Sequence, residues 1–83
     1  METARCKAFL AAAELGSFSR AAEKLSYTAS GVNQLITAME NDFGFPLLKR
    51  SNKGVSLTSE GETMLPLVRA LVHQERKLYE QAA

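Results

Sequence analysis

The sequence has only one cysteine, Cys6, and one histidine, His73. A single cysteine rules out an internal disulfide framework and fits a reducing compartment. No group of cysteine, histidine or carboxylate residues has the spacing of a metal site, and no glycine-rich loop follows a strand. These absences argue against an enzyme and predict neither a metal nor another cofactor. We expect Cys6 to be a small core residue and His73 to be a surface or interface residue.

Long apolar runs are also missing. No stretch approaches the roughly 18 apolar residues that a membrane-spanning helix needs. The alanine-rich stretch 8–13 is too short for a signal peptide, and Glu14 follows it directly. With 83 residues, 46% of them hydrophobic, the chain has enough apolar material for one small core. The sequence therefore predicts a cytoplasmic protein.

The chain has little excess charge of either sign, and its net charge is +1. Residues 1–47 carry four bases and five acids, and residues 59–83 carry three bases and four acids. Residues 48–58 hold Lys49, Arg50 and Lys53 and no acid. The sum does not predict a nucleic-acid binder, but the basic excess lies in one short segment.

Charge is absent altogether between Leu25 and Met39, although 23% of the chain is charged. If this stretch is a helix, with roughly 100° per residue, its apolar residues share one side: Val32, Leu35, Ile36, Met39 and Phe43. The opposite side carries short, uncharged hydrogen-bonding side chains: Ser30, Asn33, Gln34 and Thr37. Such a row suits the reading of base edges in a groove. From this helix alone, a solvated polar face is an equally open interpretation.

A shorter helix is predicted just before it, with Ser17 as its N-cap and a buried stripe formed by Phe18, Ala21, Ala22 and Leu25. The two adjacent alanines would let another helix cross closely. Residues 26–28 connect the two helices, and Thr28 is the expected N-cap of the second. Two helices joined by so short a turn form a helix-turn-helix, which presents the N-terminal residues of its second helix to the major groove.

Further elements are predicted on both sides of this pair. The first helix is expected from an N-cap at about Thr3 to Leu15, with Gly16 ending it. Residues 47–50 and 55–57 are typical of two short strands around a turn at 51–54. Leu48, Val55 and Leu57 can face the core, while Arg50 and Lys53 would stand near the hairpin tip. Such a wing suits phosphate or minor-groove contacts, and the alternative is a solvated basic loop.

The last predicted helix begins at Thr58 or Ser59, and Ser59 with Glu62 has the spacing of a capping box. Pro66 should kink it. An apolar stripe continues beyond the kink and consists of Val68, Leu71, Val72, Leu78 and Tyr79. A helix of about 22 residues spans roughly 33 Å, which is more than so small a domain can cover. We therefore expect a two-fold homodimer through this helix.

These elements predict a mainly α fold, a winged helix-turn-helix with a three-helix core, a two-stranded wing and a long C-terminal linker or dimerisation helix. Residues 1–58 would form the first unit and residues 59–83 the second. The run 16–25, GSFSRAAEKL, resembles the helix-turn-helix signature of LysR-type transcriptional regulators. The resemblance extends over about residues 6–69, with matches at these positions and in the run 57–61: Val32, Ile36, Glu40, Gly44, Pro46, Leu47, Leu48 and Arg50.

The resemblance implies an N-terminal DNA-binding domain followed by the linker helix that dimerises it. It also implies a larger domain that senses a small-molecule effector, which this sequence does not contain, so we expect a fragment of a longer regulator rather than a stand-alone module. In the family, the positions matching Ala29, Ser30, Asn33 and Gln34 contact DNA and are commonly Gln, Pro or Ser, Ser and Arg. The differences at Ala29, Asn33 and Gln34 imply another operator preference and weaker phosphate anchoring.

The leading prediction is sequence-specific binding of double-stranded DNA for transcriptional regulation, with residues 29–43 in the major groove and the wing, residues 48–57, on the backbone or minor groove. The expected DNA contacts are Thr28, Ala29, Ser30, Asn33, Gln34, Thr37, Arg50 and Lys53. The two amides would read base edges, the hydroxyls would contact bases or phosphates, and the two bases would anchor the wing. The alternative is a winged helix that binds another protein and does not read DNA, which the low net charge favours.

Overall fold

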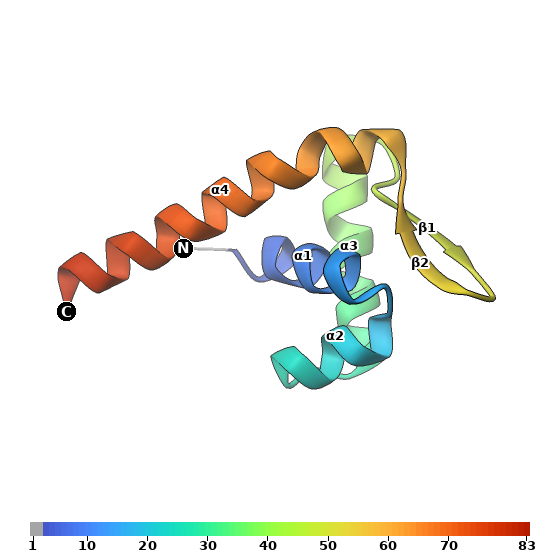
Figure 1. Ribbon diagram of the computed structural model, residues 1–83, viewed down its shortest axis with the longest axis horizontal. Coiled ribbons are helices and arrows are strands. Elements are labelled where there is room, and N and C mark those ends of the chain that lie inside the picture. The colour runs from blue at the N-terminus through green and yellow to red at the C-terminus, as the bar shows by residue number, and fades with distance from the viewer. Residues whose placement is uncertain (1–2) are drawn as a thin grey trace.

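The computed structural model describes residues 3–83 and contains, in this range, four helices and one two-stranded antiparallel sheet. The elements, in order, are α1 (Ala4–Leu15), α2 (Phe18–Leu25), α3 (Ala29–Phe43), β1 (Leu48–Ser51), β2 (Gly54–Leu57) and α4 (Ser59–Ala82). The first three helices pack together, the β-hairpin projects from one side, and α4 runs across the body and out at the other side (Figure 1). The predicted winged helix-turn-helix with a long final helix is confirmed.

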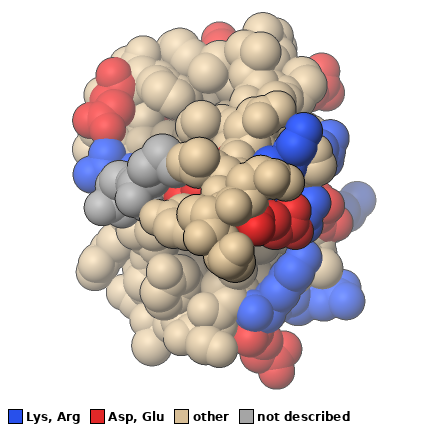
Figure 2. All heavy atoms as spheres, turned by 90° about the vertical axis from the view of Figure 1, so that its left-hand side faces the viewer, with Lys and Arg blue, Asp and Glu red and all other residues tan. Residues whose placement is uncertain are grey.

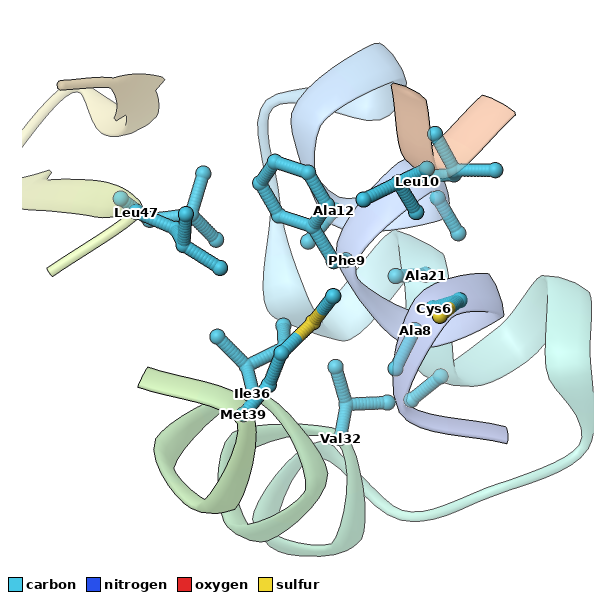
Figure 3. Packing of buried hydrophobic residues seen from close by; sticks show 14 residues of the cluster. Cys6, Ala8, Phe9, Leu10, Ala12, Ala21, Val32, Ile36, Met39 and Leu47 are labelled. Atoms are coloured by element: carbon cyan, nitrogen blue, oxygen red, sulfur yellow. The ribbon is translucent and has the colours of Figure 1, made fainter. Parts of the chain in front are cut away.

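The core lies around α1, which contacts α2, α3 and α4. Its largest fully buried side chains are Phe9, Val32, Ile36 and Leu47, and they converge on one another from three segments of the chain (Figure 3). Small residues fill the helix crossings, as predicted for the adjacent alanines of α2, and the buried ones are Ala8, Ala11, Ala12, Ala21 and Ala22. The close crossings hold α3 firmly against α1 and α2.

The helix-turn-helix is fixed at its two predicted N-caps. The Ser17 hydroxyl accepts a hydrogen bond from the Arg20 backbone N–H at 3.2 Å, and the Thr28 hydroxyl accepts one from the Gly31 N–H at 2.9 Å. Each cap satisfies a donor that the first helical turn would otherwise leave free. The start of α3 is therefore set by its own sequence as well as by the packing below it.

The hairpin pairs Leu48 with Leu57 and Ser51 with Gly54, so each strand differs by one residue from the prediction. Near its turn, the hairpin is attached to the connection between α1 and α2, where the Val55 N–H donates to the Gly16 carbonyl oxygen at 3.0 Å. A Cβ on Gly54, whose φ is +113°, would lie 2.5 Å from that same oxygen. Only glycine allows the wing to approach this closely.

The end of α3 is tied to the start of the wing. One carboxylate oxygen of Glu40 accepts hydrogen bonds from the backbone N–H groups of Leu47 and Leu48, at 2.7 and 3.2 Å. Leu47 precedes β1 and is fully buried. These hydrogen bonds therefore fix the position of the wing relative to α3.

Thr58 is the N-cap of α4. Its hydroxyl accepts from the Gly61 N–H at 2.9 Å and donates to the Pro46 carbonyl oxygen at 2.7 Å. The Ser59–Glu62 capping box does not form, because Thr58 and not Ser59 is the N-cap, and the Ser59 hydroxyl donates to Glu60. α4 continues without interruption through Pro66.

Two other local predictions need correction in part. Thr3 is the N-cap of α1, as expected, but its side chain makes no capping hydrogen bond. Its hydroxyl donates instead to the Glu75 carboxylate of α4. Phe43, expected in the core stripe of α3, is 39% exposed because it lies in the last turn, and its ring lies near that of Phe45.

Candidate nucleic-acid interface

The outward side of α3 carries the polar row predicted from the sequence. Ser30, Gln34 and Thr37 are exposed, as are Thr28 and Ala29 at the start of the helix. Val32, Ile36 and Met39 on the opposite side are buried. The helix therefore presents small hydroxyls and one long amide on a rigid support, with no charged residue before Glu40.

Asn33 differs from its neighbours in this row. Its side chain is half-buried, and its amide oxygen is covered and has no hydrogen-bond partner within residues 3–83. An unpaired buried carbonyl oxygen is unfavourable by about 1–3 kcal/mol. Asn33 is thus less accessible than predicted, and Gln34 is the amide of α3 that is fully presented to solvent.

The wing brings its three basic residues to the surface, although they are not equivalent. Lys49 and Lys53 are exposed, and the Lys53 N–H donates to the Ser51 hydroxyl in the turn. Arg50 lies two residues after Leu48 in β1, so both side chains are on the same face of the strand. The guanidinium carbon of Arg50 lies 4.9 Å from the centre of the Phe18 ring at the start of α2. This cation–π contact braces the wing against the helix-turn-helix.

The role of Phe18 as a support for the wing could not be predicted, because nothing in a linear pattern pairs residue 18 with residue 50. Glu75 was not predicted as a contact residue either, although the sequence holds a signal for it. Val68, Val72 and Tyr79 recur at helical spacing, and Glu75 lies between Val72 and Tyr79 in the same stripe. A carboxylate on the buried side of a helix requires a polar partner.

Glu75 has two such partners. The Thr3 hydroxyl donates to one carboxylate oxygen at 2.6 Å, and the Lys7 ammonium lies 3.1 Å from the other. These hydrogen bonds, that from Thr3 foremost, lower the pKa of Glu75. Burial raises the pKa of the neighbouring Cys6 thiol, and the Glu75 carboxylate raises it further. Cys6 is therefore held as a neutral thiol in the core, as expected.

The remaining charged groups make few contacts. Arg5 of α1 forms an exposed ion pair with Asp42 near the end of α3. His73 is exposed, and its Nδ1 lies 3.2 Å from a guanidinium nitrogen of Arg76. No group of three or more potential metal ligands occurs within residues 3–83. In the same range, no helix combines the length and apolarity needed to cross a membrane.

A family model for bacterial regulatory helix-turn-helix proteins of the lysR family matches residues 4–62. The chain belongs to this family. The HTH-type transcriptional regulator YofA of Bacillus velezensis is 36% identical over 85 residues, which cover 99% of this chain and 30% of YofA. The HTH-type regulator y4mQ of Sinorhizobium fredii is 47% identical over 57 residues, which cover 69% of this chain and 19% of y4mQ. The chain thus spans less than a third of the length of these relatives.

Solved structures of LysR-family DNA-binding domains have the same fold. The DNA-binding domain of CbnR, solved in complex with DNA, has a TM-score of 0.90 and 30% identity and covers 99% of this chain and 94% of its own. That of BenM, solved with benA site 1 DNA, has a TM-score of 0.89 and 27% identity, covering 99% of this chain and 92% of its own. The resemblance inferred from the sequence is confirmed, and the chain is a DNA-binding regulatory domain rather than an enzyme.

Proposed function

We propose that this domain binds specific sites on double-stranded DNA as a homodimer, with the start of α3 in the major groove and the wing on the backbone or minor groove. The observation that carries this proposal is the polar, uncharged outward side of α3. It is held rigidly by the buried opposite side and by the Thr28 cap. Two structural neighbours with the same fold, the DNA-binding domains of CbnR and BenM, were solved in complex with DNA, which supports double-stranded DNA as the partner.

The exposed side chains of α3 differ in what they can recognise. Gln34 offers both a donor and an acceptor, which is the pattern that matches the major-groove edge of adenine. Ser30 and Thr37 offer single hydroxyls to a base edge or a phosphate. Asn33 can reach a base only with the part of its amide that is not covered. Thr28 and Ala29, at the start of α3, would lie against the sugar–phosphate backbone.

The wing supplies the positive charge that α3 lacks. Lys53, at the exposed turn, is free to follow a phosphate or enter the minor groove. Arg50 is fixed over Phe18, so its role combines wing support with a phosphate contact. With Lys49, these bases concentrate charge beside an otherwise neutral reading helix, an arrangement that separates anchoring from sequence readout.

The homodimer is proposed from the far part of α4. Leu71, Leu78 and Tyr79 are 53%, 55% and 57% exposed, and Val72 is half-buried. Val68 is 4% exposed and belongs to the chain's own core, so it is not available to a partner. Broad uncharged areas lie on the end of the molecule where α4 terminates, with charged side chains gathered mainly along one edge (Figure 2). A second copy would cover the exposed side chains of Leu71, Leu78 and Tyr79.

The test is a fluorescence titration of duplexes first selected from a random pool. Gln34→Ala should lower affinity for the selected sequence about tenfold and leave affinity for unrelated duplexes unchanged. Lys53→Ala should weaken binding to every duplex and reduce the dependence of log affinity on log salt by about one unit.

Gln81→Ala, an exposed amide on α4, is the matched control and should change neither quantity. Equal losses on all sequences for Gln34→Ala and Lys53→Ala would contradict the assigned roles. If the wild-type chain showed no affinity for any duplex at low salt, the proposal would fail, and a protein partner for the polar side of α3 would be favoured.

A further inference from the structure

The two parts of α4 are held to the body in different ways. Up to Val72, the helix packs through Gly61, which is buried against Leu47, and through Val68 in the hydrophobic core. Beyond Val72, Glu75 is the only buried residue in the described part of the helix, and its side chain is 8% exposed. We call residues 76–82, which follow it, the overhang of α4. Glu75 is therefore the last buried point of α4 before the overhang.

Three residues meet at this point: Glu75 of α4, Thr3 just before α1, and Lys7 in α1. We call them the Glu75 latch. Thr3 is 6% exposed, and its hydroxyl serves Glu75 rather than its own helix. Lys7 reaches the second carboxylate oxygen, so the carboxylate is held from both sides. The carboxylate also lies near the positive end of the α1 dipole, which favours its charged form there.

Open space lies on both sides of the latch. A groove of about 730 Å³ separates α4 from α1 and α2 and is lined by Leu10, Leu25, Glu75 and Tyr79 among others. A second groove of about 450 Å³ is lined by Thr3, Leu71, Glu75 and Leu78 among others. With these grooves on either side, Glu75 is, among the described residues, the last buried contact between α4 and the body before the overhang begins. Figure 1 shows α4 passing the start of α1 and continuing beyond it.

We propose that the Glu75 latch sets the angle between α4 and the DNA-binding body, and that this angle fixes the separation of the two α3 helices in the homodimer. The inference rests on the proposed function, since it needs both DNA binding and a dimer through α4. Glu75, Thr3 and Lys7 are positioning residues and do not touch DNA in this proposal. They would determine the spacing of half-sites that the dimer accepts.

The geometry makes the spacing sensitive to small rotations. The longest extent of the molecule is 43 Å. A rotation of about 5° over that length displaces the far end by about 4 Å, close to the rise of one base pair. Dimeric helix-turn-helix proteins read half-sites at a separation set by their own geometry. A latch that holds the angle narrowly therefore restricts the dimer to one spacing, and a loosened latch admits several.

The experiment uses duplexes with two copies of a selected half-site at separations that vary by single base pairs. For the wild-type chain, a shift of one base pair from the preferred separation should lower affinity about tenfold. For Thr3→Val, which keeps the shape but removes the hydroxyl, the same shift should lower affinity only about twofold. Glu75→Gln should likewise make affinity less dependent on half-site separation. Thr3→Ser keeps the hydroxyl donor and should retain the wild-type dependence.

Several readouts separate positioning from a general loss of structure. Affinity for a duplex with one half-site should be the same in wild type, Thr3→Val and Glu75→Gln, and so should the dimer mass in sedimentation. Hydrogen exchange of the amides in residues 76–82 should be faster in both variants. Glu80→Gln removes an exposed carboxylate from the overhang, where no partner contacts it within residues 3–83, and should leave every readout unchanged.

The outcomes distinguish the inference from the proposed function. If the wild-type chain binds with a sharp spacing preference that Thr3→Val and Glu75→Gln retain, the inference is overturned and the proposed function stands. A wild-type chain that binds DNA with no spacing preference also overturns the inference alone. A wild-type chain that binds no duplex overturns both.

Discussion

The two long helices, α3 and α4, each bury one side in the same core, but their outward sides differ. That of α3 exposes Ser30, Gln34 and Thr37, whereas that of α4 exposes Leu67, which is 62% accessible, and Leu71 and Leu78. Exposed hydroxyls and amides are satisfied by water and gain specificity only from a partner with matching donors and acceptors. Exposed leucines gain about 25 cal/mol for each Å² of apolar surface that is covered. One domain therefore offers a hydrogen-bonding surface and a hydrophobic surface, which suit DNA and a second copy of the chain respectively.

The largest expected difference between the two helices comes from removing the same side-chain volume at a buried position of α3 and at an exposed position of α4. Ile36→Ala in α3 should lower the free energy of unfolding by about 2–5 kcal/mol, because Ile36 is fully buried. Leu71→Ala in α4 should change it by less than about 0.5 kcal/mol when it is measured at protein concentrations below those at which the chain self-associates. Urea denaturation measures both. Leu71→Ala should instead weaken self-association in sedimentation, and an equal cost at both positions would show that the outward side of α4 is packed within one chain.

Glycines on the two helices provide a second comparison. A Cβ on Gly61 of α4 would collide with the Leu47 carbonyl oxygen, whereas one on Gly31 of α3 would lie 3.2 Å from the Thr28 hydroxyl oxygen. Gly61→Ala should therefore destabilise the fold by about 1–3 kcal/mol. Gly31→Ala should change stability by less than about 1 kcal/mol, since the better helix propensity of alanine offsets the tight contact. Thermal unfolding of the two variants checks the difference, which would vanish if α4 could shift away from Leu47.

Much of the architecture follows from local signals that lie close together in the sequence. The caps at Ser17 and Thr28, the turn at Gly16 and the buried stripe of α3 depend on neighbouring residues, so their spacing predicts them. The contacts that join distant segments do not follow. Arg50 over Phe18 and Thr3 against Glu75 depend on how the elements pack, and no periodicity links positions so far apart. The covered amide oxygen of Asn33 is a consequence of packing in the same way.

The contribution of the Glu75 latch to the free energy of unfolding should depend on pH. The pKa of Glu75 is lowered in the folded chain, so the latch contributes stability above the unfolded glutamate pKa of about 4.3. That contribution is lost as the pH falls through the lower folded value. The stability difference between wild type and Glu75→Gln should therefore be constant from pH 7 to about 5 and shrink below about pH 4. Denaturation of wild type and Glu75→Gln at a series of pH values measures this difference, and a difference that stays constant down to about pH 3 would contradict the prediction.

The smallest expected effect on stability concerns the two amides of α3. Asn33→Ala removes a covered, unpaired carbonyl oxygen along with its packing, so the free energy of unfolding should change by less than about 0.5 kcal/mol or rise slightly. Gln34→Ala, at an exposed position, should also leave stability unchanged but should cost more DNA affinity than Asn33→Ala. Calorimetry and titration of the selected duplex compare the two. A loss of more than about 1 kcal/mol for Asn33→Ala would mean that its amide oxygen is satisfied in solution, by an ordered water for instance. In that case Asn33 would stabilise the fold rather than read DNA. Recognition of bases by α3 would then depend on Gln34, Ser30 and Thr37.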